Sequence, residues 1–270
     1  MPLLLKTVPA SHGPRWVGDA FRLFGRRPLA FTMLFMLFLL AAFVVAQVPL
    51  LGGLVQMMAL PLLSLGFMVA GQSALLDGAV RPMQFVEPLR GDPARRRALL
   101  VLCVIYGLAA LAIVFLADAV SNNAWDRLQQ LMTKGEAAQK EVDALLSEPG
   151  VATGALLLVV LGSILSVPFW HAPALVHWGG QGVAQSLFSS TLGVWRNKGA
   201  FLAYFMAWVL VVLVFGLASA LLLGVLGAPQ LAGLFGVPAG LVFSAVFYVS
   251  VLFTFNDCFR GSEVSPQALK

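Results

Sequence analysis

The sequence predicts an all-α integral membrane protein with six transmembrane helices, on the basis of two observations. Of the 270 residues, 60% are apolar and only 11% are charged, whereas soluble domains average about 45–50% and about 25%. The 17 Lys and Arg and the 12 Asp and Glu all lie outside six long apolar stretches. Hydrocarbon imposes this segregation, because a charge at the centre of a span is costly. The composition excludes soluble, disordered and disulfide-rich proteins.

Each of the six stretches is long enough to span a bilayer. A spanning helix needs roughly 20 apolar residues, because the hydrocarbon core is about 30 Å thick and each residue rises about 1.5 Å. The stretches are Leu29–Val48, Gly52–Leu76, Ala98–Ala117, Val151–Val176, Ala200–Gly224 and Val237–Phe255. They lack the alternation that is typical of β-barrel strands. We therefore expect a single membrane domain, residues 1–270.

The distribution of basic residues predicts the orientation of the spans. With six spans, 14 of the 17 Lys and Arg fall on the side that holds both termini. The remaining three are Arg127, Lys134 and Lys140. The positive-inside rule then places both termini in the cytoplasm. Because topology explains the high pI, we expect no nucleic-acid partner.

Two amphipathic segments precede the first and the fifth span. In residues 15–26, the Trp and Phe side chains share one helical face, and Arg15, Asp19, Arg22 and Arg26 share the opposite face. Residues 183–195 have a similar apolar face. This pattern is typical of helices that lie in the headgroup plane. The alternative interpretation, that each segment packs on the cytoplasmic ends of the spans, is equally compatible with the pattern.

The same two regions suggest an internal duplication. Arg26, Ala30 and Phe31 recur as Arg196, Ala200 and Phe201 at a constant offset of 170 residues. In each region a surface helix is followed by a helical hairpin that starts in the cytoplasm. We therefore predict a parallel internal repeat, with copies at residues 14–97 and 183–260.

One sizeable loop, residues 118–150, lies on the predicted periplasmic side. Trp125, Leu128, Leu131 and Met132 recur at helical spacing, and a second apolar group follows after Gly135. Two short amphipathic helices are expected here. The acidic loop could serve as a solvated cap or as a docking surface for a membrane-protein partner.

The sequence contains no recognisable catalytic or metal-binding motif. His12, His171 and His177 lack the spacing of a metal or haem site and are expected at the membrane interface. Asp77 and Asp257 end two spans and are interpreted as solvated polar caps. No nucleophile elbow, phosphate-binding loop or zinc-protease motif is present. We therefore predict a protein that is not an enzyme and uses no cofactor or metal.

Three further groups of residues are candidates for packing, lipid contact or cavity formation. Small residues at intervals of four predict a tight hairpin of the last two spans, with an oligomer interface as the alternative: Gly216, Ala220, Gly224, Gly236, Gly240 and Ser244. Basic residues at the membrane surface are candidate contacts for lipid headgroups: Arg22, Arg26, Arg27, Arg95, Arg96 and Arg97. Pro61, Pro168 and Pro173 interrupt helical hydrogen bonding and could shape a cavity.

Three stretches resemble an uncharacterised family of six-span inner-membrane proteins of proteobacteria. They are residues 16–29 with Trp16, Phe21, Phe24 and Arg27-Pro28-Leu29, residues 169–176 with Phe169-Trp170 and Ala172–Val176, and the corner at residues 196–202. A looser likeness exists to membrane domains that accompany glycerophosphodiester phosphodiesterases, whose hydrolase domain is absent here. The resemblance implies a bacterial inner-membrane location and carries no known activity.

Two functions remain compatible with the sequence. The first is a non-enzymatic scaffold or accessory subunit of a membrane assembly, bound to lipids and to a membrane-protein partner. The second is an uncoupled transporter or binder of a lipid or hydrophobic solute, since ion coupling usually needs ionisable groups at the midplane.

Overall fold

The computed structural model describes residues 3–49, 51–132 and 139–259, and this part of the chain forms helices and turns without strands. Within it, six helical segments are long and apolar enough to cross a membrane. They are α2 (Pro28–Ala46), α3 (Gly52–Leu75), α5 (Pro93–Val120), α8 (Pro149–Phe169) continued by α9 (Ala172–His177), α11 (Lys198–Val225) and α12 (Ala232–Cys258). The predicted all-α fold with six spans is confirmed.

Shorter helices connect the spans. They are α1 (His12–Arg26), η1 (Pro82–Phe85), α4 (Glu87–Arg90), α6 (Ala124–Met132), α7 (Gln139–Leu146), α10 (Val183–Arg196) and η3 (Pro229–Leu231). Proline occupies the first turn of α2, α5 and α8, where a backbone N–H has no helical partner to lose. Gly227, with φ of +63°, follows the end of α11 and allows the chain to turn towards α12.

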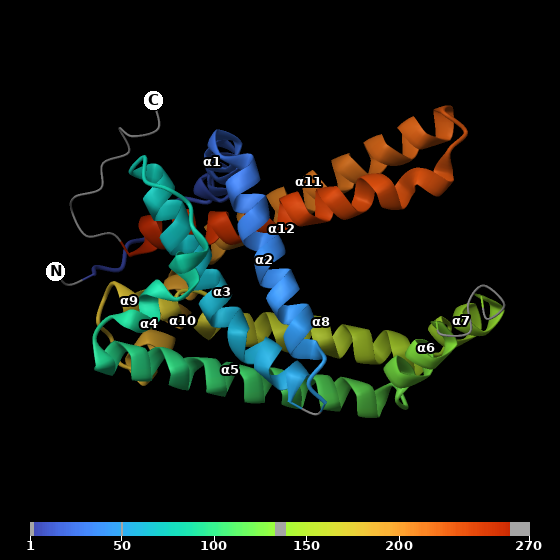
Figure 1. Ribbon diagram of the computed structural model, residues 1–270, viewed down its shortest axis with the longest axis horizontal. Coiled ribbons are helices and arrows are strands. Elements are labelled where there is room, and N and C mark those ends of the chain that lie inside the picture. Colours follow the sequence, from blue (N-terminus) through green and yellow to red (C-terminus); the bar gives the residue numbers. More distant parts are fainter. Residues whose placement is uncertain (1–2, 50, 133–138, 260–270) are drawn as a thin grey trace.

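The spans form two arms joined near the chain termini (Figure 1). In one arm α5 lies alongside α8, and α3 packs on α5. In the other arm α11 and α12 form a hairpin that projects away from α8. α12 reaches the rest of the protein through α1, α2 and α3.

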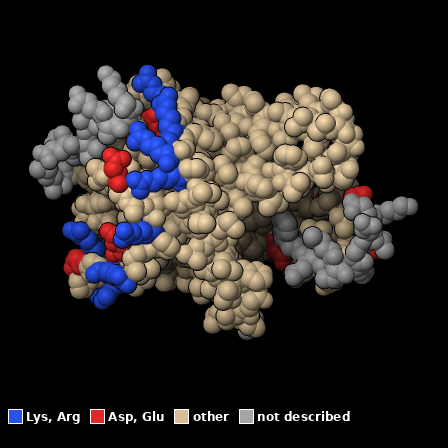
Figure 2. Space-filling model, turned by 45° about the horizontal axis from the view of Figure 1, so that its top comes forward, with Lys and Arg blue, Asp and Glu red and all other residues tan. Residues whose placement is uncertain are grey.

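Charged side chains are confined to the ends of the molecule. On the face shown in Figure 2, Lys and Arg gather at one end, and the broad middle carries uncharged side chains. We call this the basic end; it includes Arg22–Arg27, Arg90–Arg97 and Arg196–Lys198. The uncharged middle has the surface that a hydrocarbon environment requires.

The apolar face of α1 packs on protein. Trp16 is 1% exposed and Leu23 is fully buried, and α1 lies against α11 and α12. The Trp16 ring is 5.4 Å from the Phe201 ring and 6.0 Å from the Tyr204 ring, measured between centroids. Of the two interpretations of the first amphipathic segment, the structure supports packing on the spans.

The second amphipathic helix, α10, is oriented differently. It buries Ser186, Ser190 and Gly193 against α8, α9 and neighbouring residues, whereas Phe188 and Trp195 are each 69% exposed. The exposed apolar side chains agree with a helix that lies at the membrane interface. The two segments share a sequence pattern but differ in which face the protein covers.

The loop at residues 118–150 contains two short helices, as predicted. α6 and α7 lie on either side of residues 133–138, so Lys134 and Gly135 fall outside the described residues. Arg127 of α6 donates two hydrogen bonds to Glu148, at 2.9 and 2.7 Å. These hydrogen bonds lower the pKa of Glu148 and raise that of Arg127, so the pair fastens α6 to the start of α8.

The small residues of α11 and α12 do not pack the hairpin tightly. A Cβ atom added at Gly216, Gly224, Gly236 or Gly240 would meet nothing within 4 Å. Ala220 is exposed and Ser244 is half-buried. The predicted tight α11–α12 packing at these positions is therefore wrong.

Aromatic side chains explain this difference, because they fill the space between the two helices. Phe215 and Phe243 lie with ring centroids 5.2 Å apart, and Trp208 and Phe247 lie 5.8 Å apart. Close backbone approach occurs instead between α5 and α8. A Cβ atom at Gly154 would lie 2.8 Å from the carbonyl oxygen of Ala117.

Gly13 and Gly18 offer a matched test of α1 docking. A Cβ atom at Gly13 would lie 2.4 Å from both Ala200 O and Tyr204 N, whereas at Gly18 it would meet nothing within 4 Å. We expect Gly13→Ala to destabilise the protein by about 1–3 kcal/mol through overpacking, and Gly18→Ala to be neutral or stabilising by up to about 1 kcal/mol. The midpoint of thermal unfolding in lipid discs measures both effects. Equal midpoints for the two variants would contradict the docking of α1.

Candidate functional site

A large hollow lies between the two arms. This lateral cleft has a volume of about 650 Å³ and is lined by α8, by Val194 of α10, by Phe201 and Phe205 of α11 and by Phe247 of α12. The lining residues on α8 include Val159, Gly162, Ser163 and Ser166. The spacing of these four residues places them on one helical face. Val159 is 66% exposed, so this face of α8 is uncovered along the cleft.

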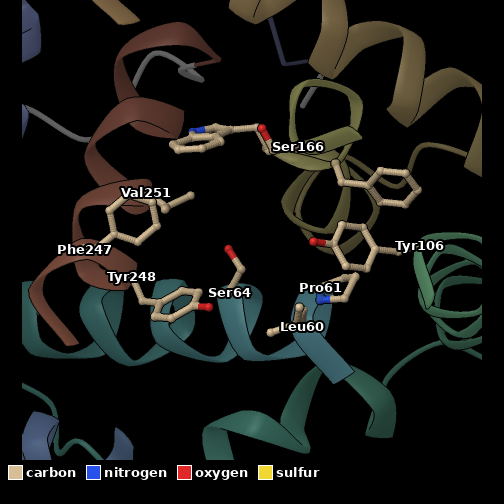
Figure 3. A pocket seen from close by; sticks show the side chains of 10 residues that line it. Leu60, Pro61, Ser64, Tyr106, Ser166, Phe247, Tyr248 and Val251 are labelled. Carbon is tan, nitrogen blue, oxygen red and sulfur yellow. The ribbon is translucent and has the colours of Figure 1, made fainter. Parts of the chain in front are cut away.

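A smaller hollow, the inner pocket, lies beside the lateral cleft, on the side of α3 and α5. Its volume is about 200 Å³, and it shares Ser166, Trp170 and Phe247 with the cleft. The remaining lining residues are Leu60, Pro61, Ser64, Tyr106, Phe169, Tyr248 and Val251 (Figure 3). The two hollows therefore adjoin and share part of their wall, with the cleft along the uncovered face of α8 and the pocket against α3 and α5.

One of the three predicted cavity-shaping prolines lines a hollow, and a second lies next to lining residues in the sequence. Pro61 lines the inner pocket. Pro168 lies inside α8 between Val167, which lines the cleft, and Phe169, which lines the pocket. Pro173 is buried in α9 and lines neither hollow.

Four side chains with hydroxyl groups line the inner pocket, from four different helices (Figure 3). They belong to Ser64 of α3, Tyr106 of α5, Ser166 of α8 and Tyr248 of α12. Ser166 donates to the Ser163 carbonyl at 2.7 Å. Among the described residues, the hydroxyls of Ser64, Tyr106 and Tyr248 have no hydrogen-bond partner. An otherwise apolar space thus presents free polar groups at one end.

Trp170 forms the boundary between the cleft and the pocket, and its orientation is fixed by hydrogen bonding. Its indole N–H donates to Thr254 Oγ1 at 3.1 Å. Thr254 itself donates its single proton to the carbonyl of Val251, so it accepts from Trp170 and from Nε2–H of His171, which lies 3.0 Å away. The rings of Phe205 and Phe247 meet Trp170 edge-on.

His171 is buried, contrary to the prediction of an interfacial histidine. It is fully enclosed, and its backbone N–H donates to Ser190 Oγ at 3.0 Å. The ring lies among Phe201, Phe255 and Phe259. A proton on Nε2 leaves Nδ1 as a bare acceptor, which accords with its lack of a partner. The described residues contain no group of His, Cys, Asp and Glu that could hold a metal ion.

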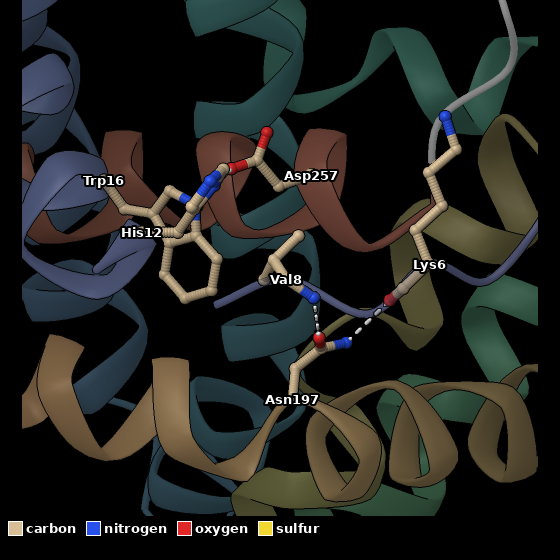
Figure 4. Close-up of polar contacts among 6 residues, drawn as sticks. All are labelled: Lys6, Val8, His12, Trp16, Asn197 and Asp257. Carbon is tan, nitrogen blue, oxygen red and sulfur yellow. Dashed lines mark hydrogen bonds and ion pairs between the residues drawn. The ribbon is translucent and has the colours of Figure 1, made fainter. Parts of the chain in front are cut away.

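Two polar side chains, Asp257 and Asn197, connect separate segments of the chain at the basic end (Figure 4). Asp257 Oδ2 accepts from Trp16 Nε1 and contacts His12 Nδ1, each at 2.7 Å. The interpretation of Asp257 as a solvated cap is therefore wrong, because it joins the end of α12 to α1. Asp77, with φ of +58°, ends α3 and is exposed, in agreement with a polar cap.

Asn197 provides the second tie. It is 1% exposed; its Oδ1 accepts from Val8 N at 2.7 Å, and its Nδ2 donates to the carbonyls of Lys6 and Gly193, each at 2.9 Å. Lys6 N in turn donates to Cys258 O. The N-terminal segment, the α10–α11 corner and the end of α12 are thereby held together.

The six candidate arginines lie at the basic end in different settings. Arg27 donates hydrogen bonds to the carbonyls of Asp77 and Gly78, and Arg95 donates to the carbonyl of His177. Arg22 pairs with Asp19. The others, Arg26, Arg96 and Arg97, are exposed. Arg27 and Arg95 therefore hold the ends of helices together, in addition to any contact with lipid.

Apart from Pro61, the residues that line the inner pocket were not predicted from the sequence. These residues are scattered over four helices, and each hydroxyl alone is ordinary in a membrane span. A weak signal exists in α8, where Ser163, Ser166 and Trp170 share a helical face with Gly162. Only the packing of α3, α5 and α12 shows which other hydroxyls meet them.

Comparison with known proteins identifies the family. The chain is 33% identical, over 257 residues, to a probable inner membrane protein of Burkholderia thailandensis; the alignment covers 95% of this chain and 94% of the relative. The chain belongs to the family of that protein. No family model matches the chain, and no solved structure is significantly similar. The predicted membership of an uncharacterised inner-membrane family is confirmed, and the protein is an inner-membrane protein of six apolar helices.

Asn197→Ala tests the tie at the basic end. Without this amide, Val8 N–H and the Lys6 carbonyl lose their partners, at a cost of about 1–3 kcal/mol for a buried unsatisfied group. We expect the Val8 amide to exchange hydrogen for deuterium faster, whereas the amides of α5 keep their protection. Lys198→Ala, at the neighbouring exposed position, is the control. Unchanged exchange at Val8 would show that Asn197 does not hold the N-terminal segment.

Proposed function

We propose that this protein is a non-enzymatic inner-membrane protein that binds a lipid or another hydrophobic molecule in the lateral cleft, either as a binder or as an uncoupled transporter. The observation that supports this function is the space of the lateral cleft and the adjoining inner pocket. It is about 650 Å³ and about 200 Å³ in its two parts, and ligand pockets commonly span about 300–1,000 Å³.

The chemistry of the cleft favours a hydrophobic ligand. Its lining consists of aliphatic and aromatic side chains with two serines, and none of the lining residues is charged. Ser163 donates to the carbonyl of Val159 in its own helix, which leaves the cleft surface apolar. Because the uncovered face of α8 lies along the cleft, a molecule dissolved in the bilayer could enter from the side. An ion-coupled mechanism is not required.

Gly162 and Gly53 provide a matched pair of variants for this function. Each lies in a membrane helix, and a Cβ atom at either position would meet nothing within 4 Å, but only Gly162 lines the cleft. We expect Gly162→Leu to fill the cleft and reduce the retained ligand at least about fivefold, and Gly53→Leu to leave it unchanged. The protein would be extracted in polymer-bounded discs, and mass spectrometry would count each retained lipid and metabolite per protein. Equal retention by both variants would refute binding in the cleft.

The same measurement addresses the second candidate, a scaffold or accessory subunit with a membrane-protein partner. The exposed small residues of the projecting α11–α12 hairpin favour it, because Gly in membrane helices allows another helix to approach closely. A stoichiometric protein in the discs that is lost on Gly216→Leu and Gly240→Leu would support this function. Discs that hold this protein alone would argue against it.

We further propose that both termini face the cytoplasm. The support is the collection of Lys and Arg at the basic end, which the positive-inside rule assigns to the cytoplasm. A cysteine introduced at exposed Arg96 should react with an impermeant maleimide in inverted inner-membrane vesicles and should remain unlabelled in intact spheroplasts. A cysteine at Asn122 should show the reverse. Labelling of Arg96→Cys from the outside would reverse the orientation.

A further inference from the structure

Three of the four hydroxyl groups that line the inner pocket have no hydrogen-bond partner in the described part of the protein. Several hydroxyls of the described spans have partners within the protein: Tyr204 OH lies 2.6 Å from Ser250 Oγ, and Thr254 donates to a backbone carbonyl. The hydroxyls of Ser64, Tyr106 and Tyr248 instead point into the pocket (Figure 3). A polar group in hydrocarbon without a partner is costly, so the pocket is suited to an occupant that accepts hydrogen bonds.

The lining also restricts the charge and the shape of that occupant. No lining residue is charged, so nothing in the pocket would compensate the desolvation of a phosphate or a carboxylate. Aromatic rings form much of the wall, namely Tyr106, Phe169, Trp170, Phe247 and Tyr248. Tyr106 and Phe169 are packed edge to face with centroids 5.0 Å apart, which makes this wall rigid. Stacking and edge contacts with such a wall favour a flat, uncharged ring.

The dimensions fit a ring that carries a hydrocarbon tail. An apolar cavity of roughly 150 Å³ holds benzene, so the volume of about 200 Å³ accommodates a ring with small substituents. The tail would run past Ser166 and Trp170 into the lateral cleft, since these residues line both hollows. Carbonyl oxygens on the ring would accept from the free hydroxyls on three separate helices.

We propose that the inner pocket binds the carbonyl-bearing ring of a membrane-soluble quinone, with the tail of the quinone in the lateral cleft. The assignment rests on the proposed function, because it names the chemical class of the hydrophobic ligand. Ser64, Tyr106 and Tyr248 donate hydrogen bonds to the ring carbonyls, and Trp170 covers one side of the ring. Binding alone is assigned, and no electron transfer is involved.

The test compares two ligands and two variants in discs of defined phospholipid. The ligands are decyl-benzoquinone and decylbenzene, which share a ring and a tail and differ in the carbonyl oxygens. The first variant combines Ser64→Ala, Tyr106→Phe and Tyr248→Phe, which removes the three donors and keeps both aromatic rings. The control is Thr153→Ala, whose hydroxyl already bonds to the Pro149 carbonyl of its own helix and which lines neither hollow. Native mass spectrometry of protein released from the discs counts bound ligand at a series of ligand concentrations.

We expect wild type and Thr153→Ala to bind one decyl-benzoquinone, and the triple variant to bind it at least about tenfold more weakly, because three hydrogen bonds are lost. Decylbenzene should bind all three proteins equally. Equal affinity of wild type and triple variant for the quinone would overturn the assignment. If the quinone fails to bind while phospholipid retention still depends on Gly162, the quinone assignment falls and the proposed function stands. If the quinone fails to bind and phospholipid retention does not depend on Gly162, both the quinone assignment and the proposed function are refuted.

Discussion

The packing of α1 against α11 and α12 is the contact on which the arrangement of the membrane helices depends. α1 is too polar to span the bilayer, yet its apolar face is as well buried as any span in the described chain, with Trp16, Ala20 and Leu23 almost completely enclosed. Phe21 extends this contact to the rings of Trp208 and Phe243. Because α1, α2 and α3 hold α12, the hairpin is attached on the side away from α8. The lateral cleft is the space that this attachment leaves.

Hydrogen bonds at the basic end then fix α1 in place. Asp257 binds the indole of Trp16 and the ring of His12, and Asn197 binds the backbone of the preceding segment. Both side chains lie at helix ends, where buried backbone groups need partners. The same end carries the basic residues that set the topology. The residues that set the topology and the residues that hold the bundle together therefore lie at the same end of the protein.

The sequence predicted the features that depend on hydrocarbon alone. Charge segregation defined the six spans, and helical periodicity defined α1, α6, α7 and α10. Periodicity could not show what covers an apolar face: α1 turns its Trp and Phe towards protein, and α10 turns Phe188 and Trp195 outwards. Spacing also misplaced the close helix contact, because Phe215 and Phe243 keep α11 and α12 apart, whereas Gly154 meets α5 directly. Which face of a helix is buried, and how closely two helices approach, depend on the side chains of the second helix.

Some hydroxyl groups of the spans have all their hydrogen-bond partners within the protein, and others remain available to a ligand. Thr254 accepts two hydrogen bonds and donates one, so it is fully used in holding Trp170 and His171. Ser64, Tyr106 and Tyr248 gain nothing comparable from the protein, although alanine or phenylalanine would fill the same positions without desolvating a polar group. Their convergence on one pocket, beside a tryptophan whose orientation is fixed by Thr254, is what a binding site for an uncharged polar ring requires. Tyr204 and Ser250, which are paired with each other, show the other arrangement, in which a hydroxyl is used within the fold.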